Sequence, residues 1–132
     1  MGRKDPVWYM TLHRLAQGDL LDIDKEDPRL ANQIVNCLEY AKKFGDILNP
    51  RDKRYNAILS YPAALGCIRL KRYGCEWRCI LRVIRKSDKA VVDARFVTPD
   101  PALHYLQVVY IGIKDRAHDI YVLDIPDRIS LL

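Results

Sequence analysis

The sequence predicts an α+β fold, in which N-terminal helices pack on one face of a twisted, mostly antiparallel sheet of four or five strands. Three observations point to this fold. Apolar residues repeat with a helical spacing in the first third of the chain, they alternate in period two from Gly66 onward, and turn residues separate the later apolar runs. Because the helical patterns come first and the strand patterns follow, the helices are expected to share one face of the sheet.

Length and composition are those of one globular domain. The chain has 132 residues, enough for a single two-layer core, so we expect one domain over 1–132 with a polar tail at about 1–6. Apolar residues make up 49% of the chain, which argues against disorder. No apolar run approaches the roughly 20 residues that span a bilayer, and the N-terminus lacks the apolar stretch of a secretory signal. These features predict no membrane partner and a cytoplasmic location.

The first part of the chain holds the helical patterns. Residues 7–14 fit either a short strand or the start of a helix. The stripe that follows has a helical spacing: Leu12, Leu15, Ala16 and Leu20. Residues 22–27 are predicted to form an acidic hinge between this helix and the next.

The next helix has the clearest signals. Asp27 is a good N-cap residue, Pro28 suits the first helical position, and Gly45 is a typical stop. Its wide apolar face is made by Leu30, Ala31, Ile34, Val35, Cys37, Leu38 and Ala41. Residues 45–62 are predicted to form a loop, because Asn-Pro and Tyr-Pro pairs interrupt any regular pattern.

The second half of the chain is predicted as the sheet. Strands are expected over 67–73, 76–85, 90–97 and 104–113, with a possible short last strand over 119–125. The run 104–113 is apolar on both faces near its middle, which is typical of a central strand. Alternation places Trp77 on the core side of its strand. The same alternation points Arg69, Arg78 and Arg82 outward from the face opposite the helices.

Charge is distributed unevenly. Residues 1–50 hold seven basic and eight acidic residues, net −1, whereas residues 51–132 hold fifteen and nine, net +6. A basic half of this kind favours binding of a polyanion such as nucleic acid, through phosphate neutralisation and counterion release. A solvated basic surface without a partner explains the same charge. The placement of the cations along the strands favours nucleic acid.

The chain has four cysteines, and they do not form a zinc motif: Cys37, Cys67, Cys75 and Cys79. A site made by the last three with a histidine is conceivable, but the spacing is not that of a zinc ribbon or finger. Small buried apolar residues in a reducing compartment explain the cysteines better. No metal and no cofactor is expected.

Two sequence patterns resemble the RelE/ParE superfamily of small bacterial toxins. The first runs from Arg69-x-Lys71 through a turn at 73–75 to Trp77-Arg78 and an apolar pair. The second is an apolar strand at 108–113, followed by Lys114-Asp115-Arg116 and Asp119-Ile120-Tyr121. The resemblance covers roughly 12–123. The chain departs from the usual family member in its greater length and in the spacing between Arg116 and Tyr121.

The resemblance implies a RelE-like endoribonuclease that cleaves mRNA on the ribosome without a metal, and whose partner is a cognate antitoxin. In that reaction the 2′-hydroxyl attacks the adjacent phosphate, so a base, an acid and cations are needed. Arg78 is the first candidate to stabilise the phosphate, because its planar guanidinium matches phosphate oxygens. The other implied catalytic residues are Lys71, Arg116, His118 and Tyr121. The implied RNA-binding residues are Arg69, Arg72, Arg82 and Lys114.

Two alternatives compete with the mRNA endoribonuclease. One is a ParE-like toxin that inhibits DNA gyrase through protein contacts, against which the cluster of His118 and Tyr121 argues mildly. The other is a catalytically inert module of the same fold that binds RNA or a protein. His13 and His104 have no sequence companions that suggest chemistry.

Overall fold

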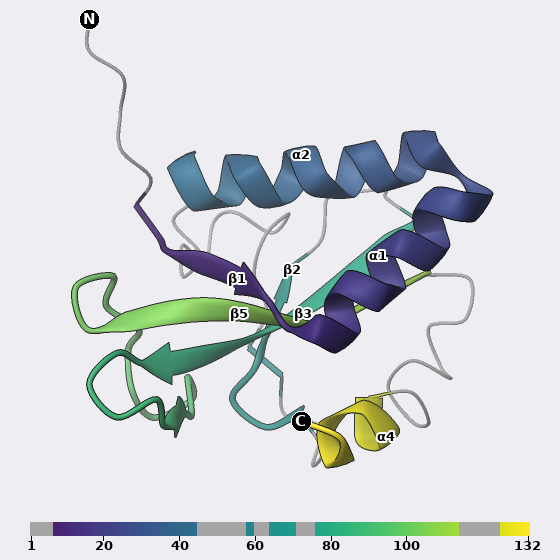
Figure 1. Cartoon of the computed structure of the whole chain (residues 1–132). Helices are drawn as coiled ribbons and strands as arrows, with labels where there is room; N and C mark the ends of the chain where they lie inside the picture. The colour runs from purple at the N-terminus through teal and green to yellow at the C-terminus, as the bar shows by residue number, and fades with distance from the viewer. Residues whose placement is uncertain (1–6, 45–57, 60–63, 71–75, 114–124) are drawn as a thin grey trace, which may run out of the picture.

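The computed structural model describes residues 7–44, 58–59, 64–70, 76–113 and 125–132. They form an α+β fold, as predicted, with two N-terminal helices on one face of a mixed, open five-stranded sheet (Figure 1). The elements are β1 (Met10–Leu12), α1 (Arg14–Glu26), α2 (Pro28–Phe44), β2 (Ile68–Leu70), β3 (Trp77–Arg85), β4 (Val91–Val92), β5 (His104–Ile113) and α4 (Ile125–Ser130). None of the described helices is long and apolar enough to cross a membrane.

Helices α1 and α2 begin at side-chain caps. The Asp27 carboxylate accepts the Leu30 N–H at 3.1 Å, so the predicted N-cap of α2 is confirmed. Residues 7–14 resolve into strand β1 and then the cap of α1. The predicted acidic hinge at 22–27 is wrong, because α1 continues to Glu26 and buries Ile23 in the core. Only Asp27 separates α1 from α2.

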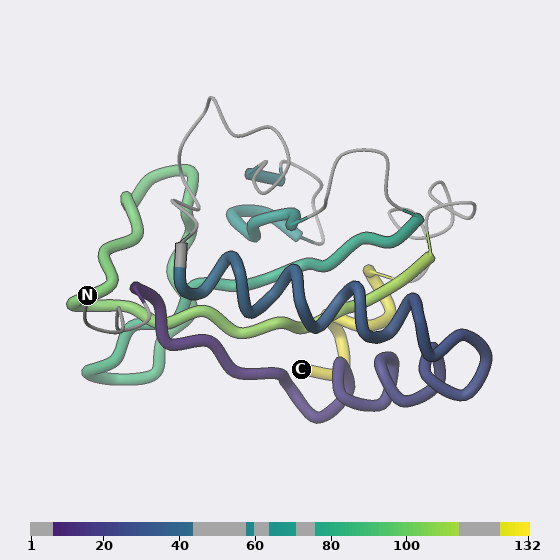
Figure 2. Tube along the Cα trace, turned by 90° about the horizontal axis from the view of Figure 1, so that it is seen from above, coloured from purple at the N-terminus to yellow at the C-terminus, as the bar shows by residue number. Residues whose placement is uncertain are grey.

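The sheet has the strand order β1-β5-β3-β2, with β4 also paired to β3. Strand β5 is central, as its two-sided apolar pattern predicts. It pairs parallel to β1 and antiparallel to β3, and the β3 pairs with β2 and β4 are antiparallel as well. Seen from above, helix α2 crosses over the middle of the sheet (Figure 2).

Apolar residues are buried on both faces of the sheet. The larger cluster lies between the helices and the sheet and includes Trp77, which is fully buried as predicted. The second cluster lies on the opposite face, where α4, Leu59 and residues 64–67 pack against the middle of the sheet. Its described members are Leu59, Ala64, Cys67, Ile80, Val109, Tyr110 and Ile125. The face opposite the helices is therefore an apolar centre with cations around it, and not the continuous cationic surface that alternation predicts.

A β-bulge in β5 shapes this second face. Ile80 pairs with Tyr110 and Leu81 pairs with Val108, so Val109 is an extra residue in β5. Val109 and Tyr110 consequently both belong to the second cluster, although they are neighbours in the chain. The bulge is the physical reason why one face gathers more apolar side chains than strict alternation allows.

Two predicted strands are corrected. The strand expected at 90–97 is only the pair Val91–Val92, because the Asp93 carboxylate accepts the Arg95 N–H at 2.9 Å and turns the chain. At the other position, 119–125, Ile125 begins helix α4 and 119–124 lie outside the described residues. The tail at 1–6 and residues 71–73 of the first predicted strand lie outside them as well.

Candidate nucleic-acid interface

Three of the nine predicted site residues fall in the described part of the chain: Arg69, Arg78 and Arg82. The others, Lys71, Arg72, Lys114, Arg116, His118 and Tyr121, lie outside it. The geometry of the site is therefore built from the three arginines and from the side chains that the fold brings to them.

The sheet register gathers the three arginines around one position. Arg69 of β2 pairs with Ile80 of β3, and Arg78 and Arg82 lie two residues before and after Ile80 on the same side of β3. All three thus lie on the face opposite α1 and α2, as the alternation predicts. A polyanion that crossed the strands on this face would meet guanidinium groups from two neighbouring strands.

Arg78 is buried, with 8% of its surface exposed, which corrects the prediction that it faces solvent. Its Nη1 donates to the carbonyl oxygen of Trp77 at 2.8 Å. On the neighbouring strand Arg78 pairs with Gly112, and the Tyr110 side chain lies across that glycine so closely that a Cβ there would overlap the phenol. Arg78 is therefore part of the packed structure, and its removal is expected to lower stability.

Arg82 is half-buried and is oriented by β5. It pairs with Gln107 across the strands, and its Nε donates to Gln107 Oε1 at 2.7 Å. Because arginine has only donors, the amide oxygen of Gln107 must be the atom that faces it. This single bond leaves the two Nη nitrogens of Arg82 as the terminal donors of the fork.

Cys67 lies next to Arg82 but has no nucleophilic character. The pKa of the Cys67 thiol is raised to about 11, mainly by burial; Arg82 acts against this rise and Asp93 adds a smaller upward effect. Such a thiol stays protonated at neutral pH and is a poor nucleophile. Among the described residues, Cys37, Cys67 and Cys79 are buried thiols that form no disulfide. Within the described ranges no three His, Cys, Asp or Glu side chains gather to hold a metal ion.

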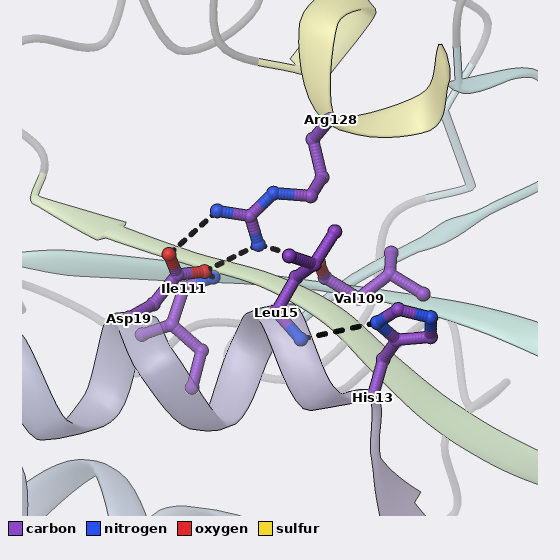
Figure 3. Close-up of polar contacts among 6 residues, drawn as sticks. All are labelled: His13, Leu15, Asp19, Val109, Ile111 and Arg128. Carbon is purple, nitrogen blue, oxygen red and sulfur yellow. Dashed lines mark hydrogen bonds and ion pairs between the residues drawn. The ribbon is translucent and has the colours of Figure 1, made fainter. Parts of the chain in front are cut away.

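A polar junction that sequence reasoning missed joins α1, β5 and α4 (Figure 3). Arg128 of α4 forms a two-pronged ion pair with Asp19 of α1, with N–O distances of 2.7 and 2.6 Å. Asp19 also accepts the Ile111 N–H at 3.0 Å, and Arg128 donates to the Val109 carbonyl at 3.0 Å. No local signal could have identified this pair, because its members are 109 residues apart in the sequence.

His13 also has a role that the sequence did not indicate. Its Nδ1 accepts the Leu15 N–H at 3.1 Å and so caps α1 (Figure 3). A neutral imidazole that accepts at Nδ1 carries its proton on Nε2. Burial lowers the pKa of His13, and the cations Arg82, Arg14 and Arg128 lower it further, so the neutral form is favoured.

An apolar groove lies on the helix side of the molecule, at the outer edge of the sheet. Two adjoining hollows of about 320 and 170 Å³ share Leu12 of β1, Leu20 of α1 and Val35 of α2. Leu21 at the rim is 62% exposed. Among the described strands, β1 beside the groove has a neighbour on one side only. These features are typical of a surface that binds a protein segment.

Comparison of the chain with protein-family models, with curated proteins and with solved structures found no match.

Proposed function

We propose that the chain is the toxin of a toxin–antitoxin pair and acts in the cytoplasm as a metal-free endoribonuclease on ribosome-bound mRNA. The observation that carries the proposal is the convergence of Arg69, Arg78 and Arg82 on one face of the sheet. Guanidinium groups from adjacent strands suit a phosphodiester backbone, because each can donate two parallel hydrogen bonds to phosphate oxygens. The described residues of the first sequence pattern that resembles the RelE/ParE superfamily lie on these same strands.

The proposed chemistry divides the work between exposed and buried cations. Arg82, half-buried with free terminal donors, would contact the RNA, while Arg78 would add positive potential from beneath the surface. The base that activates the 2′-hydroxyl and the acid that protonates the leaving oxygen would come from Lys71, His118 or Tyr121. The described arginines can supply one part of this reaction. They can lower the activation barrier by stabilising the negative charge that develops on the phosphate oxygens.

The proposed partner, an antitoxin, would use the groove between α1, α2 and β1. Its apolar lining suits an apolar segment of a partner, and the edge of β1 that no described strand pairs with can form main-chain hydrogen bonds. Binding there would leave the arginine face, on the other side of the sheet, to be covered by a separate part of the antitoxin.

A second candidate function is a catalytically inert module that binds RNA or a protein. The burial of Arg78 and the apolar cover over Ile80 favour it, because a phosphate held in a cleavage geometry needs an open cationic surface. In this candidate function Arg82 binds RNA, but the protein does not cleave it.

The test is primer extension on a reporter mRNA in a cell-free translation reaction, with a ribosome-free control. Arg82→Gln and Arg78→Gln are compared with Arg85→Gln, which removes the same positive charge from an exposed position at the end of β3, and a thermal melt of each variant checks that it is folded. We expect cuts on translated message only, lost in the first two variants and kept in the third. Intact message with the wild-type protein refutes the endoribonuclease, and RNA binding without cuts would support the inert module.

A further inference from the structure

We propose that His13, Gln107 and Arg82 form a binding site for a phosphate group, on the sheet face opposite α1 and α2 and at the end nearest β1. The site goes beyond the proposed function, because it would bind a phosphate whether or not the protein cleaves RNA. Its ligand is either a free phosphate or a phosphodiester of single-stranded RNA, which share the chemistry that the site recognises.

The register of three strands builds the site. Thr11 of β1 and Arg82 of β3 both pair with Gln107 of β5, so the three side chains form one row across the sheet. His13 follows Thr11 by two residues, its backbone N–H donates to the Val108 carbonyl at 2.8 Å, and Arg82 is close enough to act on the charge of its imidazole. The cap of α1, β5 and β3 thus bring these side chains into one region of the sheet although the sequence separates them widely.

The polar groups of these three side chains that are not used in hydrogen bonds within the site are all donors. Arg82 uses only Nε toward Gln107, and Gln107 uses its only acceptor atom toward Arg82. The two Nη groups of Arg82 and the amide nitrogen of Gln107 therefore remain. His13 adds its Nε2–H, because Nδ1 is occupied by the Leu15 N–H. Within the described part of the chain, no hydrogen bond engages these groups, and no carboxylate accepts from them.

The electrostatic surroundings favour an anion. The charged groups that act on His13 are all cations, namely Arg82, Arg14 and Arg128. Two acidic side chains in this region are already engaged. Asp19 is held by Arg128, and Asp93, which acts on the neighbouring Cys67, is held by Arg95 at 2.8 Å. A phosphate offers several oxygens to donors that come from different directions, which suits this arrangement better than a single carboxylate.

The site is separate from the position of Arg78. Arg78 and Arg82 lie four residues apart on β3, which places their Cα atoms about 13 Å apart along the strand. Ile80, fully buried in the second apolar cluster, lies between them. A phosphate at Arg82 and Gln107 would therefore be a different one from any phosphate near Arg78.

The decisive variant is Gln107→Glu, compared with Gln33→Glu as a matched control. The new carboxylate can still accept from Arg82, so strand pairing is retained, but it replaces a donor by a negative charge at the site. Gln33 is exposed on α2, so the control adds the same charge far from the row. A second variant, His13→Asn, keeps an N-cap side chain and removes the imidazole donor.

Two probes are titrated at one fixed salt concentration: inorganic phosphate, followed by NMR of the Arg82 Nε–H and Gln107 amide signals, and a short single-stranded RNA, followed by fluorescence anisotropy. We expect Gln107→Glu to weaken binding by about tenfold or more and His13→Asn by a few fold, with Gln33→Glu close to the wild type. A loss with both probes identifies a general phosphate site, and a loss with RNA alone identifies a phosphodiester site.

The proposal is overturned if Gln107→Glu binds both probes as the wild type does, or if Gln33→Glu loses as much affinity as Gln107→Glu. Thermal melts of each variant establish that the fold is retained. Because no ribosome and no cleavage step enters these measurements, a failure of the endoribonuclease proposal leaves their outcome unaffected.

Discussion

The ion pair between Asp19 and Arg128 is expected to be a main stabilising contact between α4 and the rest of the fold. The two side chains are only 17% and 16% exposed, and Asp19 also accepts the Ile111 N–H. Breaking a fully buried pair by removing one partner costs about 3–5 kcal/mol, and partial exposure reduces this. Replacing Asp19 by Ala in α1 returns roughly 0.5 kcal/mol of helix propensity. We therefore expect Asp19→Ala to lower the free energy of unfolding by about 2–3 kcal/mol.

The second arm of a double-mutant cycle is Arg128→Met, which keeps an apolar stem and leaves the Asp19 charge and the Val109 carbonyl without the guanidinium. Its expected cost is also about 2–3 kcal/mol. Since each single change already loses the shared contact, the double variant should cost less than the sum, by a coupling energy of about 1–2 kcal/mol.

Urea unfolding followed by tryptophan fluorescence measures these values, because both tryptophans, Trp8 and Trp77, are buried and will report the loss of the core. For a chain of 132 residues, a loss of 2–3 kcal/mol corresponds to a fall in Tm of about 7–11 °C. Asp24→Ala, exposed on the same helix, should stay within about 0.5 kcal/mol of the wild type. Additive costs in the cycle, or an equal loss in Asp24→Ala, would refute the coupling of α1 to α4 through this pair.

Two further predictions follow from His13 and from Gly112. The pKa of His13 is lowered in the folded protein, so below the ordinary value of 6.5 the unfolded chain binds more protons than the folded one. The stabilising contribution of His13 is therefore complete above that pH. It is lost as the pH falls through the pKa of the folded state. The stability difference between the wild type and His13→Asn should therefore shrink on acidification, and a difference that stays constant with pH would contradict this role. Gly112→Ala should cost about 1–3 kcal/mol in urea unfolding, because the new Cβ overlaps the Tyr110 phenol. The cost should fall in a Tyr110→Leu background, and an equal cost in both backgrounds would show that Tyr110 is not the obstacle.

Much of the fold could be predicted because its signals are local. The Asp27-Pro28 start of α2 was predictable because an N-cap acts within one helical turn. The long strands β3 and β5 were predictable because their apolar periods extend over nine and ten residues. The short strand β4 was overestimated, since the apolar pattern continues while Asp93 turns the chain with its own side chain.

The candidate site was harder to predict for reasons that lie outside any single segment. Alternation placed Arg69, Arg78 and Arg82 on one face, and the register supports that placement. Alternation could not show that Arg78 is buried, because the Tyr110 side chain that lies across its partner Gly112 comes from another strand, next to a bulge. Likewise, His13 has no companions in its own segment, and its neighbours Gln107 and Arg82 reach it only through strand pairing.

The sequence by itself determined the fold class, the order of the elements from α1 to β5, the limits of α2 and the side of β3 on which its arginines lie. These properties depend on spacing and capping within one segment, where the backbone geometry alone relates neighbouring residues. Only the tertiary structure decided which cations are buried, which carry free donors, and which carboxylate holds Arg128. Those outcomes depend on the register between strands and on contacts such as Asp19 with Arg128, whose members lie at opposite ends of the chain. Register and long-range pairing are set by the packing of the whole core, so no local pattern encodes them.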